Sequence, residues 1–258
     1  MPYRHGAIHV PAPASVPHLA ARARLAGPAP TRVDWLNTCP ADLDPLLNDE
    51  LGCCVAVVPY RRFQTLDARR TGIVTPIPRR NVLGRYEMNG DYVPDDPNNP
   101  TTNATDQGTD TKRDALNEVV APILGADGAP RDVWWGKITP GDTSHVAMAL
   151  SQTPLSITLG LPVAIADDPE KWVNPPGRGT GWDPASGFQH RGLLGTLEDG
   201  FWTVVTWGLL ARIHPDLLLL PGFVIAIDVF IETGRLQDLT LAGVDYDRMR
   251  ADVQRIAA

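Results

Sequence analysis

Residues 48–54 read Asn-Asp-Glu-Leu-Gly-Cys-Cys, and a mainly apolar segment follows them. Gly52 allows a tight turn into a helix whose first residues include Cys54. The free backbone N–H groups at a helix N-terminus stabilise negative charge, so a cysteine there favours the thiolate form. Asn48, six residues before Cys54, carries an amide that can donate to an oxyanion. The stretch therefore predicts a nucleophilic cysteine beside part of an oxyanion site.

The three cysteines also allow a purely structural interpretation, since a buried cysteine is usually a small core residue. Cys53 is expected in the core, and Cys39, which precedes Pro40, is expected to be structural. Adjacent cysteines such as Cys53 and Cys54 are poorly placed for a bridge. We therefore expect a reducing compartment, or one free thiol with a function.

A thiol nucleophile needs a base, and His190 is the best-placed candidate. It follows a Gly-containing loop at residues 186–189 and enters a predicted strand. A histidine at the mouth of a strand that faces a helix N-terminus suits a Cys–His pair. The alternative is an ordinary hydrogen-bonded strand histidine. The other histidines lie in an extended arm, at a helix start or in a turn: His5, His9, His18, His145 and His214.

The order of predicted elements indicates an α+β fold, with helices first and a mostly antiparallel sheet afterwards. Helical patterns occupy residues 46–70, 110–120, 145–150 and 246–256, and Pro59 is expected to kink the first helix or end its first turn early. Strand patterns occupy residues 155–161, 192–196, 202–206 and 224–230. We divide the chain into an arm, residues 1–31, and a domain, residues 32–258. The helical part of the domain is 32–150 and the sheet part is 151–258.

Two segments look suited to contacts with partners. The arm is rich in Pro and Ala, with a short helix expected near 19–25. Residues 86–112 form a long polar loop. Its acidic stretch, Asp91–Asp110, is dense in oxygen ligands that suit calcium, but it lacks the ordered spacing of a calcium loop. We expect a solvated or partner-contacting loop, with no metal and no cofactor, and Asp106 or Asp110 as a cap for the next helix.

Composition excludes some classes of function. The chain has 258 residues, 43% of them hydrophobic, and a formal charge of −7, which argues against a general nucleic-acid binder. We expect its basic cluster to be a solvated surface. That cluster comprises Arg61, Arg62, Arg69, Arg70, Arg79 and Arg80. No stretch reads as a membrane span or as a secretory signal.

The order of these parts resembles the papain-like cysteine peptidases. In that family a Gln stands six residues before the nucleophile, the Cys opens the central helix, the His enters a strand, and the next strand ends in Asn-Ser-Trp-Gly. This chain offers Asn48, Cys54, His190 and 206–208, which read Thr-Trp-Gly.

The chain is more closely similar to papain-fold proteins of bacteriophages and prophages, over roughly residues 35–253. Their Asn-Asp-x-x-Gly-Asp-Cys start resembles residues 48–54, with Cys53 in place of Asp. Their Asp-x-Gly-x-Asp loop before a Leu-Asn helix resembles residues 106–110 and 116–117. Residues 159–162 loosely match their Gly-x-x-Leu-Pro segment. Each motif is weak alone, and their shared order is more specific.

The resemblance implies a papain-like fold and a role for each site residue. Cys54 would attack, His190 would move the proton, and Asn48 with the Cys54 backbone N–H would hold the oxyanion. The position of the orienting Asn falls at Val205 or Thr206. Val cannot orient an imidazole and Thr does so weakly, so the site is either a Cys–His hydrolase acting on peptide or amide bonds or a degenerate one.

The alternative function is an inactive structural component of a phage particle, a minor capsid or tail protein. Its arm and loops would bind neighbouring virion subunits in an assembly. The expected location is the virion, or the host cytoplasm during assembly. A third interpretation is a module that uses the old cleft to bind a peptide without cleaving it.

Overall fold

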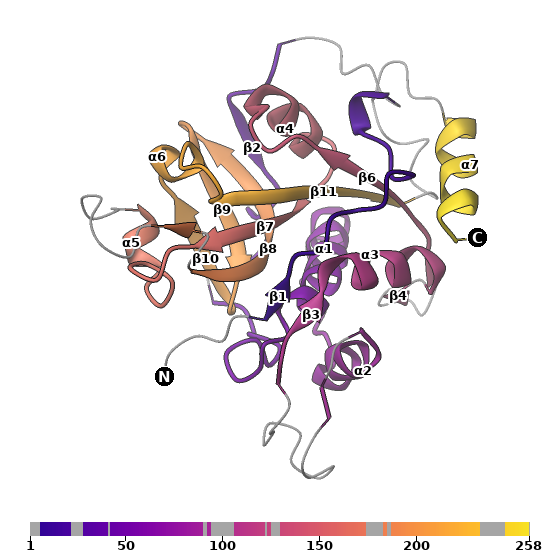
Figure 1. Cartoon of the computed structure of the whole chain (residues 1–258), viewed down its shortest axis with the longest axis horizontal. Coiled ribbons are helices and arrows are strands. Elements are labelled where there is room, and N and C mark those ends of the chain that lie inside the picture. The colour runs from indigo at the N-terminus through magenta and orange to yellow at the C-terminus, as the bar shows by residue number, and fades with distance from the viewer. Residues whose placement is uncertain are drawn as a thin grey trace.

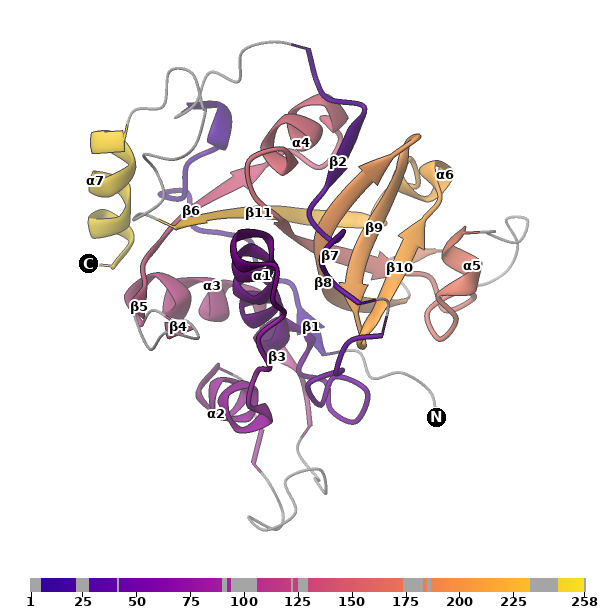
Figure 2. The same ribbon diagram turned by 180° about the vertical axis from the view of Figure 1, so that it is seen from behind.

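The computed structural model describes residues 6–21, 28–40, 42–89, 92–93, 106–121, 123–124, 130–173, 183–184, 187–232 and 246–257. Within these residues, helices and an antiparallel sheet form a mixed architecture in which the helix bearing Cys54 packs on the sheet (Figures 1 and 2). The predicted α+β class is confirmed. Most of the predicted polar loop, residues 90–91 and 94–105, lies outside the described residues.

The helices are mostly short, apart from the one that begins at Cys54. They are η1 (Leu19–Ala21), α1 (Cys54–Thr71), α2 (Arg79–Asn89), α3 (Thr111–Val120), α4 (Thr143–Leu150), α5 (Glu170–Val173), α6 (Pro215–Leu218) and α7 (Tyr246–Ala257). None of those within the described residues is long and apolar enough to cross a bilayer.

The sheet has seven strands in the described part of the chain. Its order is β10-β9-β8-β7-β11-β6, and β2 pairs with the far end of β8. Its strands are β2 (Arg32–Asp34), β6 (Val133–Ile138), β7 (Leu155–Leu161), β8 (Phe188–Glu198), β9 (Phe201–Thr206), β10 (Leu209–Ile213) and β11 (Val224–Glu232). Two small ladders stand apart from it: β1 (Ala7–Ile8) with β3 (Thr109–Asp110), and β4 (Ile123–Leu124) with β5 (Pro130–Arg131).

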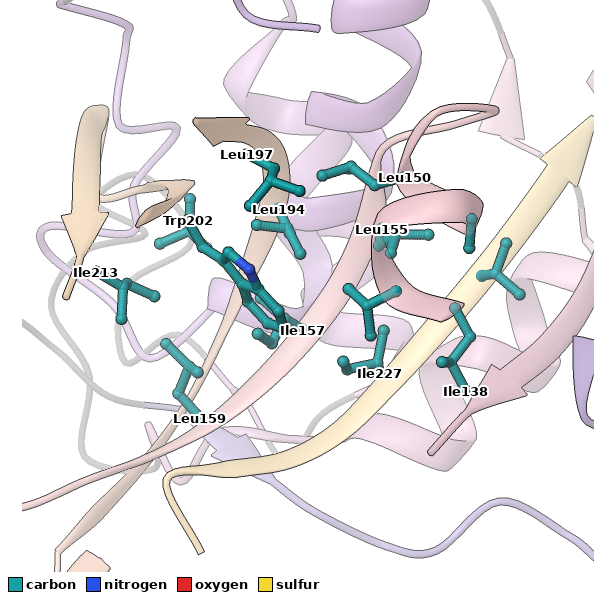
Figure 3. Close-up of a cluster of buried hydrophobic side chains, with 14 of the residues drawn as sticks. Ile138, Leu150, Leu155, Ile157, Leu159, Leu194, Leu197, Trp202, Ile213 and Ile227 are labelled. Carbon is teal, nitrogen blue, oxygen red and sulfur yellow. The ribbon is translucent and has the colours of Figure 1, made fainter. Parts of the chain in front are cut away.

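The largest hydrophobic core lies against one face of this sheet (Figure 3). Alternate residues of β7, namely Leu155, Ile157 and Leu159, are fully buried there together with Leu194 of β8 and Ile227 of β11. Because side chains alternate across a strand, the intervening residues of β7 face the side on which α1 lies. On β7, the residues on the α1 side are therefore Ser156, Thr158 and Gly160.

Helix α1 is buried on nearly all sides, between the sheet, α2 and α3 (Figure 2). Val58 packs against Leu193 and Val205 of the sheet. Pro59 lies inside α1 and does not end it, and Gly72 closes the helix with φ +74°.

The first predicted helix is wrong at its start, since residues 46–53 form turns and α1 begins at Cys54. Leu46 and Leu47 have φ +56° and +71°, a left-handed conformation that cannot continue a right-handed helix. The correction favours the predicted chemistry, because it places Cys54 at the helix N-terminus.

The prediction that the basic cluster is a solvated surface is wrong for two of its members. Arg61 and Arg62 are 3% and 0% exposed. Arg62 forms an ion pair with buried Glu118 and stacks against Phe63 and Phe230. Long side chains of this kind enter a core when their heads find a carboxylate or an aromatic face.

Aspartate residues cap helices α3 and α4. Asp110 caps α3 as predicted, since its carboxylate accepts from the backbone N–H groups of Lys112 and Arg113. Helix α4 begins at Thr143, and Asp142 caps it by accepting from the N–H of His145.

Candidate active site

Cys54 is the first residue of α1 and is fully buried. Its Sγ accepts a hydrogen bond from the backbone N–H of Arg191, 3.5 Å away on β8. Burial raises the pKa of the Cys54 thiol, and hydrogen bonds from the backbone of Arg191 and of Gly6 only partly offset that effect. The sulfur therefore lies against the backbone of the residue that follows His190.

His190 is also fully buried, and two groups hold its ring. Its Nε2 shares a hydrogen bond with Thr206 Oγ1. The indole of Trp207 lies over the imidazole, with ring centroids 4.3 Å apart and planes tilted by 32°. The structure thus joins His190 to Thr206, the predicted orienting residue, while Val205 packs in the core against Leu193.

A strained two-residue turn brings Thr206 and Trp207 to the imidazole. Trp207 and Gly208 connect β9 to β10 with φ +47° and +78°. Two left-handed residues give the twist of a type I′ hairpin, a conformation that a tryptophan rarely adopts. Gly208 is required, because a Cβ there would overlap the carbonyl of Leu43. Strain of this kind collects where surrounding structure enforces a functional geometry.

Asn48 is 1% exposed and lies in the turns before α1. Its backbone N–H donates to the carbonyl of Pro45 at 3.1 Å. Within the described part of the chain, its side-chain Oδ1 accepts no hydrogen bond. Asn48 thus stays a candidate oxyanion donor on sequence grounds, with no observed contact to Cys54.

Residues 6–10, here called the covering segment, lie over the cysteine (Figure 1). Ala7 packs on Cys54 and Val55 in one buried cluster. The segment pairs in parallel with β3, and the carbonyl of Gly6 accepts from the N–H of Thr109 at 2.6 Å. Further along, the N–H of Val10 donates to Thr111 Oγ1 at 3.2 Å.

The covering segment also contacts the sheet side of the site, where the N–H of His9 donates to Gln189 Oε1 at 2.5 Å. It therefore connects the start of α3 to β8 across the thiol. The sequence predicted an extended arm here but not its target. Gly6 was the available signal, because a residue packed backbone-to-backbone on Gly52 must lack a side chain.

Asp106 holds the turn that precedes the cysteine and does not cap α3. Both of its carboxylate oxygens accept from the N–H of Gly52, at 2.9 and 3.0 Å. Oδ1 also accepts from the hydroxyl of Tyr86 at 2.5 Å, and burial together with this bond raises the pKa of Tyr86. Asp106, the first residue of the loop motif at residues 106–110, thus fixes the turn before Cys54, although it lies over fifty positions further along the chain.

A cavity of about 310 Å³ runs beside the covering segment, along β6 and β11. Its lining includes His9, Trp135, Lys137 and Asp228. Within the described residues, no cluster of three or more His, Cys, Asp or Glu side chains is arranged to bind a metal.

Comparison with known proteins identifies the fold. No protein-family model matches the chain. No curated protein matches it either. Xylellain, a cysteine protease from Xylella fastidiosa, superposes with a TM-score of 0.61 at 11% identity, over 89% of this chain and 96% of that one.

Two further proteins match the fold. The recombinant stem bromelain precursor has a TM-score of 0.50 at 14% identity, over 90% of this chain and 78% of its own. The proform of Amb a 11, a cysteine protease and ragweed pollen allergen, has a TM-score of 0.51 at 16% identity, over 80% and 67%. The chain has the papain-like cysteine protease fold.

Proposed function

We propose that the protein is a cysteine hydrolase of the peptidase type, held latent by its own covering segment. The observation that carries the proposal is the position of the Cys54 sulfur beside the residue that follows His190. The Cys54 sulfur lies against the backbone N–H of Arg191, and the neighbouring His190 is oriented by Thr206. Cys54, His190 and Thr206 are residue types that can serve as nucleophile, base and orienting group, and the proposal adds that the thiol and the imidazole meet.

The reaction follows from these positions. His190 Nε2 is engaged with Thr206, so Nδ1 is the ring nitrogen that exchanges a proton with the thiol. The thiolate attacks the carbonyl carbon of a peptide or amide, and the backbone N–H of Cys54 and the amide of Asn48 stabilise the oxyanion. The C–N bond breaks as the imidazolium protonates the leaving amine. Water then hydrolyses the thioester and restores the thiol.

The covering segment accounts for a buried thiol in such a site. The N–H of Gly6 faces the Cys54 sulfur, while its carbonyl is turned toward Thr109. The contact from Gly6 to the sulfur is thus a backbone donor, and we expect the segment to cover the thiol without being cleaved. Its removal would restore solvent to the thiol and lower the raised pKa.

Purified protein tests the proposal through peptide hydrolysis. We expect a casein or short-peptide hydrolase activity after displacement of the covering segment, lost in Cys54→Ala and in His190→Ala. Thiol alkylation of Cys54 by iodoacetamide gives a second measurement that needs no substrate. An uncovered thiol that reacts no faster than free cysteine, with no hydrolysis, would contradict the proposal.

A second candidate is an inactive structural component of a phage particle, a minor capsid or tail protein bound to other virion subunits. The complete burial of Cys54 and the Thr in place of the orienting Asn favour it. Such a protein would be found in the virion, or in the host cytoplasm during assembly, and residues 1–31 and 86–112 would contact its neighbours. Wild-type function of Cys54→Ala in assembled particles would support this candidate over the enzyme.

A further inference from the structure

Arg191 links the two halves of the site through both its backbone and its side chain. Its backbone N–H donates to Cys54 Sγ at 3.5 Å. Its Nη1 donates to the carbonyl of Thr111, the first residue of α3, at 3.3 Å. Its Nη2 forms an ion pair with Asp228 of β11 at 2.9 Å. One side chain thus connects the helical part to the sheet, directly behind the thiol.

Asp228 is itself fixed on both oxygens. Oδ2 binds Arg191, and Oδ1 accepts from the indole N–H of Trp135 on β6 at 2.9 Å. The side chains of Arg191 and Asp228 are 2% and 10% exposed. A buried ion pair adds little stability over an apolar pair of the same size, because desolvation offsets the attraction. The ion pair between Arg191 and Asp228 is therefore better explained by the geometry that it enforces than by the stability that it adds.

The strand segment that carries His190 and Arg191 has a paired strand on one edge only. In the described residues, the pairing of β9 with β8 begins at Leu193, whereas residues 188–192 pair with β7 alone. The other edge of this segment faces the covering segment and Cys54. Once the covering segment leaves, a side-chain anchor is needed to keep the strand against the sulfur.

We propose that Arg191, clamped between Thr111 and Asp228, is a positioning residue that keeps the β8 backbone N–H aimed at Cys54 Sγ. It also keeps the adjacent His190 in register with the nucleophile. The inference deepens the proposed function and rests on it. A hydrogen bond to the charged form of a group favours that form, so the clamp favours the thiolate.

The test measures the pKa of Cys54 in full-length protein carrying Gly6→Ala, which displaces the covering segment. The pKa is obtained from the pH dependence of Cys54 alkylation and from thiolate absorbance. Other titratable or charged groups near Cys54 and Arg191 must be considered in fitting these curves. They are His9, Cys53, Arg62, Asp110, His190 and Asp228.

Three variants address the clamp. Arg191→Met removes the charge and the donors, Arg191→Lys keeps the charge, and Asp228→Asn keeps the acceptor for Trp135. We expect Arg191→Met and Asp228→Asn to raise the pKa of Cys54 and to lower its alkylation rate at pH 7 about tenfold, which corresponds to one pKa unit. Asp228→Asn isolates positioning, because the charge of Arg191 also lowers the pKa of Cys54, and this variant keeps that charge whereas Arg191→Met removes it. Arg191→Lys should recover part of the loss, since the charge remains without the forked geometry.

The matched control is Arg85→Lys, which alters another buried arginine ion pair, 2.7 Å from Asp114 and 3% exposed. It should leave the Cys54 titration unchanged while lowering the melting temperature about as much as Arg191→Lys. An unchanged or lowered Cys54 pKa in Asp228→Asn, which keeps the shape of the side chain and the charge of Arg191, would overturn the inference. Failure of the proposed function would be seen in a different measurement. The rates of hydrolysis and of Cys54 alkylation would then be the same with and without His190→Ala.

Discussion

Gly6 packs backbone-to-backbone on Gly52, two residues before the nucleophile, and a Cβ on Gly6 would overlap the Gly52 carbonyl. The same glycine fills the space beside Gly108, where a Cβ would meet the Gly6 carbonyl. Three glycines from distant parts of the chain thus form the contact that closes the site. Any side chain at position 6 forces the covering segment to move.

Gly6→Ala is therefore expected to expose Cys54. The methyl group cannot fit against Gly52, so the segment shifts and water reaches the sulfur. We expect the rate of Cys54 alkylation at pH 8 to rise at least about tenfold, since removal of a desolvated environment lowers the thiol pKa by a unit or more. Gly141→Ala is the control, because open space surrounds that glycine. Equal alkylation rates for both variants would contradict the assigned role of Gly6.

His9 makes the cover sensitive to acid. Burial lowers the pKa of His9 below its ordinary value of 6.5, Asp228 and Asp110 act in the opposite direction, and Arg191 adds to the lowering. A depressed histidine pKa means that the covered state is favoured above pH 6.5 and loses stability as the pH falls through the lowered value. We expect hydrogen-exchange protection of residues 6–10, corrected for intrinsic rates, to fall below pH 6.

The His9→Gln variant separates this titration from general acid effects. Glutamine keeps the length and polarity of the side chain without a charge change in this range. In this variant the hydrogen-exchange protection of residues 6–10, corrected for intrinsic rates, should not change between pH 7 and pH 5. If the variant loses protection as steeply as the parent, another group controls the cover.

Thr206→Val tests whether the threonine orients the imidazole. The substitution keeps the shape, removes the hydroxyl that binds His190 Nε2, and leaves a buried ring nitrogen without that partner. In a Gly6→Ala background we expect the hydrolysis rate to fall about tenfold, or about 1.4 kcal/mol of transition-state stabilisation. Thr158→Val is the matched control, since Thr158 is fully buried and its hydroxyl has no hydrogen-bond partner among the described residues. Similar losses in both variants would assign the effect to packing.

Gly208→Ala tests the turn that presents Thr206 and Trp207. The substitution places a side chain at φ +78° and against the carbonyl of Leu43, so strain and overlap add. We expect a loss of about 1–3 kcal/mol in the free energy of unfolding, measured by urea denaturation. A change below about 0.5 kcal/mol would show that the hairpin adapts without loss.

Much of this architecture is predictable from the sequence because its signals are local. The alternating pattern of residues 155–161 gives β7, and Gly52 followed by Cys53 and Cys54 gives a cysteine at a helix start. The pairing of His190 with Thr206 follows from the resemblance to papain-like peptidases, which left Val205 as the alternative. These features depend on residues within a few positions of one another, or on a family-wide order of motifs.

The remainder depends on contacts between distant segments. No local pattern places Gly6 on Gly52, or Asp106 on the N–H of Gly52. The burial of Arg61 and Arg62 reverses a reasonable expectation for charged residues, since only the tertiary fold brings Glu118 and Phe230 to Arg62. Arg191 adjoins a predicted site residue, yet its partners Thr111 and Asp228 come from two other elements.

The pH dependence of Cys54 alkylation in Gly6→Ala, with and without His190→Ala, tests the central claim most directly. A working Cys–His pair predicts that the pKa of Cys54 lies well below the ordinary thiol value of about 8.5. It also predicts that this pKa moves toward the ordinary value when His190 is removed. Two superimposable curves, both governed by an ordinary or higher thiol pKa, would contradict the assignment of Cys54 and His190 as nucleophile and base.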